Sequence, residues 1–312
     1  MLQCFQCVSA SNKWTVEMLP ISLKMVKFHI RLVVLSSIIV FSISTASPIY
    51  DSVDSEKDAA PIYDNVDFET DDDVGEYGKY FEGDMVLSVS QQQALENSYA
   101  RNGLVDEDQR WPNHTVVYHI NEEDFDEEQI SKIMNAMAEI ANHSCLIFRP
   151  RASEDEHAVV IEGSNDGCSA AVGYVPPGDD QEQTISLARG CFRHGSLVHE
   201  MLHTLGFRHM QSTHDRDDYV TVVWDNIQPE YAYNFLKYGN DSVTNLGVPY
   251  DYNSVMHYTR KAYSSNGKDT IIPLKENVNI GQRVGLSHGD IMKLNRMYCL
   301  KNKTDDEEDT YT

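Results

Sequence analysis

The spacing of apolar residues predicts both strands and helices between residues 115 and 298. Short apolar runs predict strands at 115–120, 158–161 and 184–187. A helix is predicted to follow Asp124 or Asp126, either of which could cap it, because the apolar residues after them recur at helical spacing. That stripe, which we interpret as core packing, consists of Ile130, Ile133, Met134, Met137, Ile140 and Ala141.

Two more helices are predicted, at 193–205 and at 290–298. In the second, Ile291, Leu294 and either Met297 or Tyr298 would face inward. The chain between these helices gives fewer regular signals and is richer in Gly, Asn, Asp and Tyr. We therefore expect mostly irregular structure there.

An acidic stretch precedes the predicted strands and is poor in large aliphatic residues from 47 to about 88. It contains a short repeat, in which Pro48-Ile49-Tyr50-Asp51 recurs as Pro61-Ile62-Tyr63-Asp64. Such a stretch cannot bury enough apolar surface to fold alone, so we interpret 47–101 as a propeptide. The repeat is read as a solvated spacer, with a binding or modification motif as the alternative.

A candidate secretory signal covers residues 25–46. A basic start is followed by an apolar run at 32–43 and by the small residues of 44–46. The run is too short to span a bilayer comfortably, although a signal anchor is the alternative. We expect a secreted, extracellular protein without a membrane span, and residues 1–24 look like an upstream extension that the mature protein does not need.

Composition supports a folded, acidic protein. Of 312 residues, 41% are hydrophobic and 10% aromatic, which is enough for a core. The formal net charge of −24 argues against nucleic acid as a partner, because binding to phosphates needs clustered Lys and Arg. The end of the chain, 301–312, is expected to be an acidic disordered tail.

Cysteines and glycosylation sequons agree with the secretory pathway. Four of the six cysteines follow the signal, and an even number in an oxidising compartment predicts two disulfides. These four are Cys145, Cys168, Cys191 and Cys299. The sequons open to glycosylation are at Asn113, Asn142, Asn240 and Asn302.

The strongest chemical signal lies in the helix predicted at 193–205. His199 and His203 are four residues apart, so both imidazoles project from one helix face and can bind one metal ion. Glu200 can hold a water on that metal without being a ligand. Gly206 permits a left-handed backbone that turns the chain, so that His209 becomes a third ligand. Three imidazoles suit a single Zn²⁺ and leave one position open, which is a catalytic arrangement, whereas a structural zinc site normally closes all four positions.

These residues resemble the astacin metalloendopeptidases, a family of the metzincin clan, over about residues 80 to 299. The segments that carry the resemblance are His199-Glu200-x-x-His203-x-x-Gly206-Phe207-x-His209, Asp215-Arg216-Asp217-x-Tyr219, Ser254-Val255-Met256-His257-Tyr258, Trp111-Pro112-Asn113 and Gly281-Gln282-Arg283-x-x-Leu286-Ser287-x-Gly289-Asp290. Met256 resembles the methionine that packs beneath the metal in this family.

The resemblance implies an α+β fold with two lobes, formed by residues 102–300. The upper lobe would hold a twisted, mostly parallel sheet with an antiparallel edge strand and two long helices. The lower lobe would be mostly irregular and include the C-terminal helix. The resemblance also implies the disulfides Cys145–Cys299 and Cys168–Cys191, and it makes Thr184, Ile185, Ser186 and Leu187 the edge strand on which an extended peptide substrate lies.

The implied activity is hydrolysis of peptide bonds in proteins or peptides. Glu200 would act as general base, and Tyr258 would bind zinc in the resting enzyme and then hydrogen-bond the oxyanion. Asp84 of the Phe81-Glu82-Gly83-Asp84 stretch resembles the ligand that silences the zymogen. A trypsin-like protease could cut after Arg101 to activate it, and the enzyme is expected to be a monomer.

Two further features bear on specificity and activation. In family members with an arginine in the Gly-Gln-Arg segment, that side chain lines the pocket for the residue just after the cut. The resemblance therefore implies that Arg283 attracts Asp or Glu there by a bidentate contact, with a surface arginine in a loop as the alternative. Met210 and Thr213 replace a glutamate and an arginine of the family, so a buried N-terminal ammonium would be poorly paired there. This departure is what favours the alternative function, a secreted binding protein on a weak or inactive protease scaffold.

Overall fold

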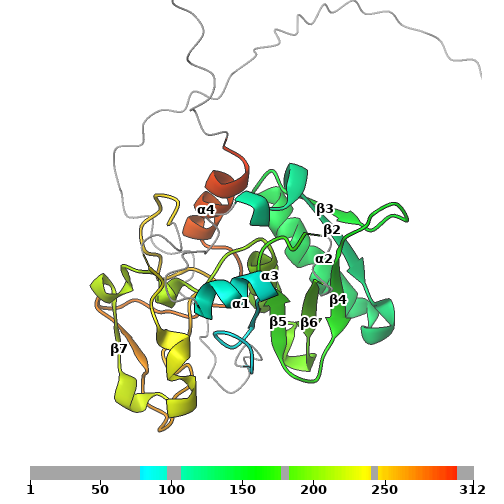
Figure 1. Cartoon of the computed structure of the whole chain (residues 1–312). Coiled ribbons are helices and arrows are strands. Elements are labelled where there is room, and N and C mark those ends of the chain that lie inside the picture. Colours follow the sequence, from blue (N-terminus) through cyan, green and yellow to red (C-terminus); the bar gives the residue numbers. More distant parts are fainter. Residues whose placement is uncertain (1–77, 97–106, 177–182, 240–244, 301–312) are drawn as a thin grey trace, which may run out of the picture. The chain divides into compact units, whose positions relative to one another are not determined.

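A computed structural model of the chain describes residues 78–96, 107–176, 183–239 and 245–300 (Figure 1). The predicted signal, the upstream extension, most of the acidic stretch, the Arg101 cleavage site and the acidic tail lie outside the described residues. So do the sequons at Asn240 and Asn302. The described residues before the gap, 78–96, are called the N-terminal segment below.

A six-stranded sheet has the strand order β1-β5-β6-β4-β2-β3. All neighbouring strands are parallel except β5 and β6, which are antiparallel. The sheet is therefore mostly parallel, as expected. Its strands are β1 (Met85–Val86), β2 (Thr115–Ile120), β3 (Ile147–Pro150), β4 (Val159–Gly163), β5 (Cys168–Ala171) and β6 (Thr184–Leu187).

The structure corrects the predicted edge strand. Thr184–Leu187 forms β6, but β6 pairs with β4 on one side and with β5 on the other, so it lies inside the sheet. The antiparallel strand on this side is β5, at Cys168–Ala171. Its sequence, Cys-Ser-Ala-Ala, lacks the β-branched and aromatic residues that mark a strand, which is why the pattern did not predict it. In this structure β1 of the N-terminal segment pairs with the other side of β5.

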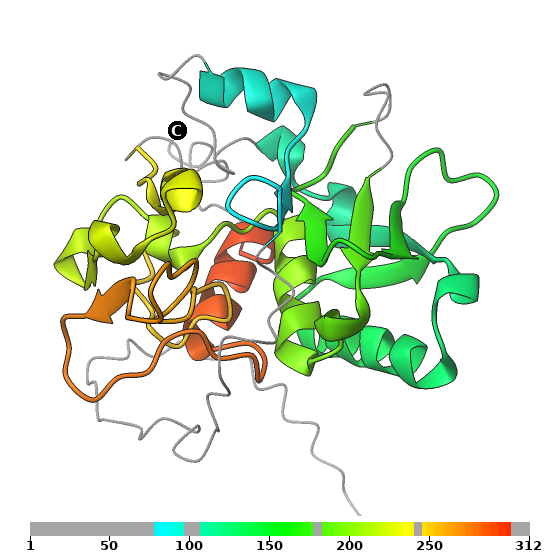
Figure 2. The same cartoon turned by 90° about the horizontal axis from the view of Figure 1, so that it is seen from below.

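Two helices pack with the sheet. Helix α2 (Glu127–Asn142) begins at Asp126, whose carboxylate accepts from the Gln129 amide while the Gln129 side chain accepts from the Asp126 amide. Of the predicted stripe, Ile133, Met137 and Ile140 are buried, Ile130 and Ala141 are partly buried, and Met134 is 41% exposed. Helix α3 (His194–Thr204) is buried along almost its whole length, between the sheet and α4 (Figure 2).

The other two helices lie near the two ends of the described chain. Helix α4 (His288–Tyr298) begins two residues earlier than predicted, because Ser287 caps it with Asp290 as the partner. Helix α1 (Val89–Glu96) belongs to the N-terminal segment. Among the described residues, none of the helices has the length and apolar composition needed to cross a bilayer.

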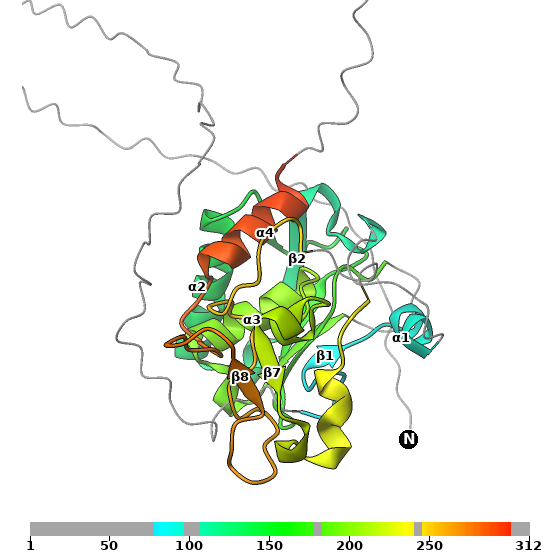
Figure 3. The same ribbon diagram turned by 90° about the vertical axis from the view of Figure 1, so that its left-hand side faces the viewer.

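The region between α3 and α4 is mostly irregular. It contains a two-stranded antiparallel sheet, β7 (Val220–Val222) with β8 (Ile271–Pro273) (Figure 3). Its hydrophobic core is separate from that of the larger sheet and includes Phe235, Tyr250 and Tyr258. Short 3-10 helices complete the described chain at Glu107–Gln109, Pro112–His114, Glu122–Asp124, Arg189–Cys191, Met210–Ser212, Arg216–Asp218, Trp224–Asn226 and Pro229–Phe235.

Two disulfides fasten these elements. Cys145–Cys299 joins the start of β3 to the end of α4, and Cys168–Cys191 joins β5 to the turn before α3. These are the pairings that the family resemblance implied. The second bond holds β5 close to the helix that carries the histidines.

Candidate metal centre

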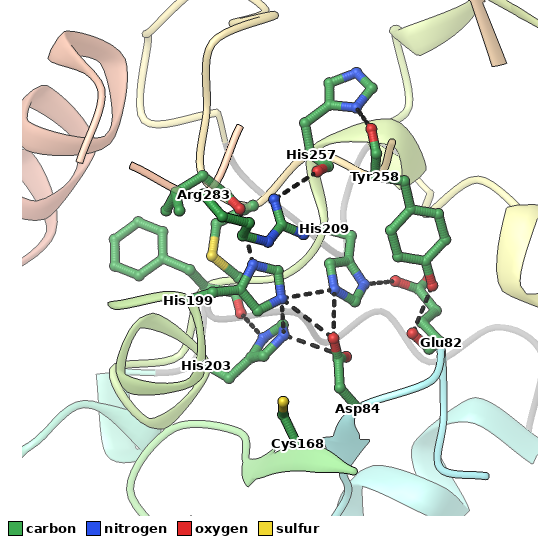
Figure 4. A network of polar contacts seen from close by, with 12 residues as sticks. Glu82, Asp84, Cys168, His199, His203, His209, His257, Tyr258 and Arg283 are labelled. Atoms are coloured by element: carbon green, nitrogen blue, oxygen red, sulfur yellow. Dashed lines mark hydrogen bonds and ion pairs between the residues drawn. The ribbon is translucent and has the colours of Figure 1, made fainter. Parts of the chain in front are cut away.

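Three histidine side chains meet at one point (Figure 4). The Nε2 atoms of His199 and His203 are 3.1 Å apart on one face of α3. Helix α3 ends at Thr204, and Gly206 adopts φ 96°, the left-handed conformation predicted for it. The turn brings His209 Nε2 to 3.2 Å from His199 Nε2. Helical spacing and one glycine turn therefore assemble the three imidazoles.

Each imidazole is oriented by a contact of its Nδ1 atom with an oxygen acceptor. His199 Nδ1 donates to the Val255 carbonyl and His203 Nδ1 to the Phe207 carbonyl, both at 2.8 Å. His209 Nδ1 lies 2.8 Å from Glu82 Oε2. A proton on each Nδ1 leaves the lone pair on each Nε2, which is the arrangement of histidines that bind a metal.

Asp84 of the N-terminal segment completes the group. Its Oδ2 lies 3.2 Å from His199 Nε2 and 3.3 Å from His209 Nε2, and its Oδ1 lies 3.3 Å from His203 Nε2. All four side chains are fully buried. Asp84 Oδ1 is a buried acceptor with no hydrogen-bond donor, which a cation among the four groups would satisfy. Three nitrogens and one carboxylate oxygen match the ligand number and ligand types of tetrahedral zinc.

The charges of the group favour metal binding. Burial raises the pKa of Asp84, but the nearby His209 and His203 outweigh it and hold that pKa well below its usual range, so Asp84 is a carboxylate. Burial lowers the pKa of His203 to about 4. For His209, burial is outweighed by the Asp84 and Glu82 carboxylates, which raise the pKa to about 9. A divalent cation would take the place of the proton that these carboxylates attract.

Glu200 follows His199 on α3 and is fully buried. It is not one of the four converging ligand groups. Glu200 is therefore not placed as a ligand, and its role as a base beside the metal stays a prediction.

The predicted methionine turn holds His199 through the Val255 carbonyl and is itself fixed by α4. Asp290 accepts from the Ser254 hydroxyl at 2.6 Å and from the Val255 amide at 2.9 Å. The Val255 carbonyl is the group that holds His199. Met256 is buried, and its carbonyl accepts from the Met210 amide. Asp290 thus connects α4 to a histidine ligand through one residue.

Tyr258 lies beside the site but faces the N-terminal segment. Its ring is 4.8 Å from the His209 ring, between centroids. Its hydroxyl donates to the Glu82 carbonyl at 2.5 Å. Tyr258 is therefore placed next to the metal position while its hydroxyl is occupied by another partner.

The departure from the family at Met210 has a structural counterpart that the sequence did not reveal. Lys293 of α4 is buried, and its ammonium lies 3.1 Å from Met210 Sδ. Burial lowers the pKa of Lys293, whereas Asp290, Asp251 and Asp215 act to raise it. Thr213 donates its hydroxyl to the Met210 carbonyl at 3.0 Å. A buried ammonium thus already occupies the place beside Met210.

Arg283 lies at the rim of the same site (Figure 4). It is partly buried, and its Nη1 donates to the carbonyls of His257 and Gln282. Its own carbonyl accepts from the Gly195 amide at the start of α3. A Cβ at Gly195 would come within 2.1 Å of the Arg283 carbonyl carbon, so the loop rests directly on the helix.

Comparison with known proteins supports the same type of site. The model of the astacin peptidase family matches residues 103–299. Seminal metalloprotease 1 of Drosophila melanogaster is 41% identical over 207 residues, which are 64% of this chain and 81% of that protein. Meprin A subunit beta of Rattus norvegicus is 39% identical over 221 residues, 70% of this chain but only 29% of that protein.

A solved structure is also similar. High choriolytic enzyme 1, a hatching enzyme zinc-protease from Oryzias latipes, aligns with a TM-score of 0.54 and 36% identity. The alignment covers 61% of this chain and 92% of that one.

Proposed function

Because the chain belongs to the astacin family of zinc metallopeptidases, we propose that it is a secreted zinc endopeptidase made as an inactive precursor. The observation that carries this proposal is the position of Asp84, within 3.2–3.3 Å of all three histidine Nε2 atoms. A carboxylate there would fill the fourth position of the metal and exclude the water that the reaction needs.

In the processed enzyme, His199, His203 and His209 would hold one zinc ion, which lowers the pKa of a water and polarises the scissile carbonyl. Glu200 takes the proton of the attacking water and delivers it to the leaving amine. Tyr258, released from the Glu82 carbonyl, donates its hydroxyl to the carbonyl oxygen as negative charge develops on it.

We propose β5 as the strand on which an extended substrate lies. In the precursor β1 occupies that position, with Met85 opposite Ala170 and Val86 opposite Ala171. The Ala170 amide donates to the Asp84 carbonyl at 2.9 Å, so the same segment covers the strand and fills the metal position. Its removal would expose both for an extended peptide.

Activation by a trypsin-like protease that cuts after Arg101 remains part of this proposal, as does a preference for Asp or Glu set by Arg283. The side chains of Asn113 and Asn142 are exposed, which leaves both sequons accessible to glycosylation in the secretory pathway. We further propose a monomer that acts without nucleic acid or membrane partners.

The test is cleavage-site profiling of the chain expressed in a secretory host, before and after trypsin treatment, beside a Glu200→Ala control. We expect zinc-dependent cleavage of a complex peptide mixture only after treatment and only with Glu200 present. Cleavage by the untreated precursor would contradict the role of Asp84. A zinc-loaded, processed protein that cuts nothing would favour the binding-protein alternative.

A further inference from the structure

Glu82, the residue two positions before Asp84, is held in a conformation that needs an explanation. Its side chain is 1% exposed and its backbone has φ 47°, in the left-handed region. That conformation is unfavourable for a residue with a Cβ, and burial of a carboxylate costs free energy unless the charge is paired. A spacer beside a metal-binding aspartate would need neither feature.

The contacts of Glu82 lead to the metal centre. Its Oε2 lies 2.8 Å from His209 Nδ1, and its carbonyl accepts from the Tyr258 hydroxyl. Burial and the nearby Glu82 carboxylate also raise the pKa of Tyr238, which keeps that hydroxyl protonated. Glu82 therefore reaches one metal ligand and the proposed oxyanion donor at the same time (Figure 4).

The three histidines differ in what holds them. His199 and His203 use the backbone carbonyls of Val255 and Phe207, neither of which belongs to the N-terminal segment. His209 uses a carboxylate from that segment. A carboxylate on the outer nitrogen makes an imidazole a more basic and better oriented metal ligand than a neutral carbonyl does.

We propose that Glu82 is a positioning residue that strengthens zinc binding in the precursor through His209, separately from Asp84. The inference rests on the proposed function, since it requires the precursor to bind zinc at this site. Asp84 and Glu82 together bring two negative charges, which match the charge of one divalent cation held by three neutral imidazoles. Loss of the segment would remove both charges and free the Tyr258 hydroxyl in one event.

The experiment measures the zinc affinity of the full-length precursor by equilibrium competition with a chromogenic chelator. All proteins carry Glu200→Ala, so that none can process itself. The variants are Glu82→Gln, Asp84→Asn and the double variant, and Glu123→Gln serves as a matched control because Glu123 is an exposed glutamate away from the site. Glu82→Gln keeps the side-chain shape and an acceptor but removes the charge.

We expect Glu82→Gln to raise the dissociation constant for zinc by about 10-fold or more, and Glu123→Gln to leave it unchanged. The double variant distinguishes an effect of Glu82 on His209 from an effect of Glu82 that only helps to place Asp84 at the metal. If Glu82 acts through His209, adding Glu82→Gln to Asp84→Asn weakens binding further. If the double variant binds zinc as Asp84→Asn does, Glu82 only docks the segment and the inference is overturned.

An unchanged affinity in Glu82→Gln would also overturn it, with the proposed function left intact. A parent precursor that binds no zinc would instead contradict the proposed function itself. These two outcomes can be told apart, because in the first the parent precursor binds zinc and in the second it does not.

Discussion

The two regions that meet at the metal centre supply their residues in different ways. Helix α3, packed on the large sheet, presents His199, Glu200 and His203 within little more than one turn, and its backbone is buried and internally hydrogen-bonded. The irregular region around β7 and β8 presents Met256 and Tyr258 from turns. Those turns are fixed by individual hydrogen bonds, such as the two that Asp290 accepts from Ser254 and Val255. A helix thus positions ligands by its geometry, whereas an irregular region needs individual hydrogen bonds.

Glu200→Ala should give the largest effect, because it removes the base supplied by the helical region. We expect the rate of peptide cleavage by the processed enzyme to fall by on the order of 10²–10⁴-fold. Zinc should remain bound at one ion per chain, since Glu200 is not among the converging ligand groups. Turnover and metal analysis on the same sample check both points, and loss of zinc together with activity would contradict the assignment.

Tyr258→Phe tests the contribution of the irregular region by removing only a hydroxyl. We expect the turnover number to fall by roughly 10²–10³-fold, as for loss of one oxyanion donor, with little change in KM. A fall as large as that of Glu200→Ala would mean that the two regions share the chemistry equally. An unchanged rate would exclude Tyr258 from it.

Asp290→Asn should show how far the irregular region depends on the hydrogen bonds of one side chain. The amide can replace only part of what the carboxylate accepts from Ser254, Val255 and Ser287, so a buried donor is left unpaired. We expect a loss of about 1.5–3 kcal/mol in the free energy of unfolding. Asp269→Asn is the control, because its contact with Arg260 is longer, at 3.5 Å, and partly exposed. Denaturant unfolding of both variants gives the comparison.

Arg283→Ala should alter selectivity more than rate. If the guanidinium receives an acidic side chain just after the cut, its loss should reduce the preference for Asp or Glu over Ala by about tenfold, equivalent to one charge-assisted hydrogen bond. Cleavage-site profiling measures this ratio directly. An unchanged profile would leave Arg283 with a structural role, such as its hydrogen bonds to the His257 and Gln282 carbonyls.

The smallest effect is expected at the edge of the large sheet. The Arg149 guanidinium and the Ala152 amide lower the pKa of Asp155 from 3.8 to about 2. Because the folded-state pKa is the lower one, the stability that Asp155 contributes is present above about pH 4 and is lost as pH falls through 2. Asp155→Asn should therefore lower Tm slightly at pH 7 and not at pH 2. The exposed Asp225 provides a control variant, Asp225→Asn.

The contrast between regular and irregular regions also explains how much of the fold could be predicted from the sequence. The strands β2 and β6 and the helix α3 follow from apolar spacing and were predicted within one or two residues. The strand β5 and the two-residue β1 carry no such pattern, so the true neighbours of β6 could not be inferred. Strand order depends on pairing between distant segments, which periodicity does not encode.

In the metal centre, likewise, only the residues that belong to a local motif could be predicted. His199, His203, His209 and Glu200 were predicted because one short motif carries them. Glu82 meets His209 across 127 residues, and Lys293 meets Met210 across 83. No local pattern marks either contact. The Phe81-Glu82-Gly83-Asp84 motif drew attention to Asp84, but a single glutamate in it gave no sign of a left-handed, buried conformation.

The disulfide pattern has a consequence for how the chain acquires its fold. Cys168 lies 23 residues from its partner Cys191, and it lies equally far from Cys145, whose own partner is 154 residues away. Loop-closure entropy depends on loop length, so it does not favour the native bond over a Cys145–Cys168 mispair. During synthesis Cys299 emerges last, and until then Cys145 has only wrong partners. Correct oxidation must therefore be selected by packing of β5 against α3, with thiol exchange correcting bonds that form before that packing does.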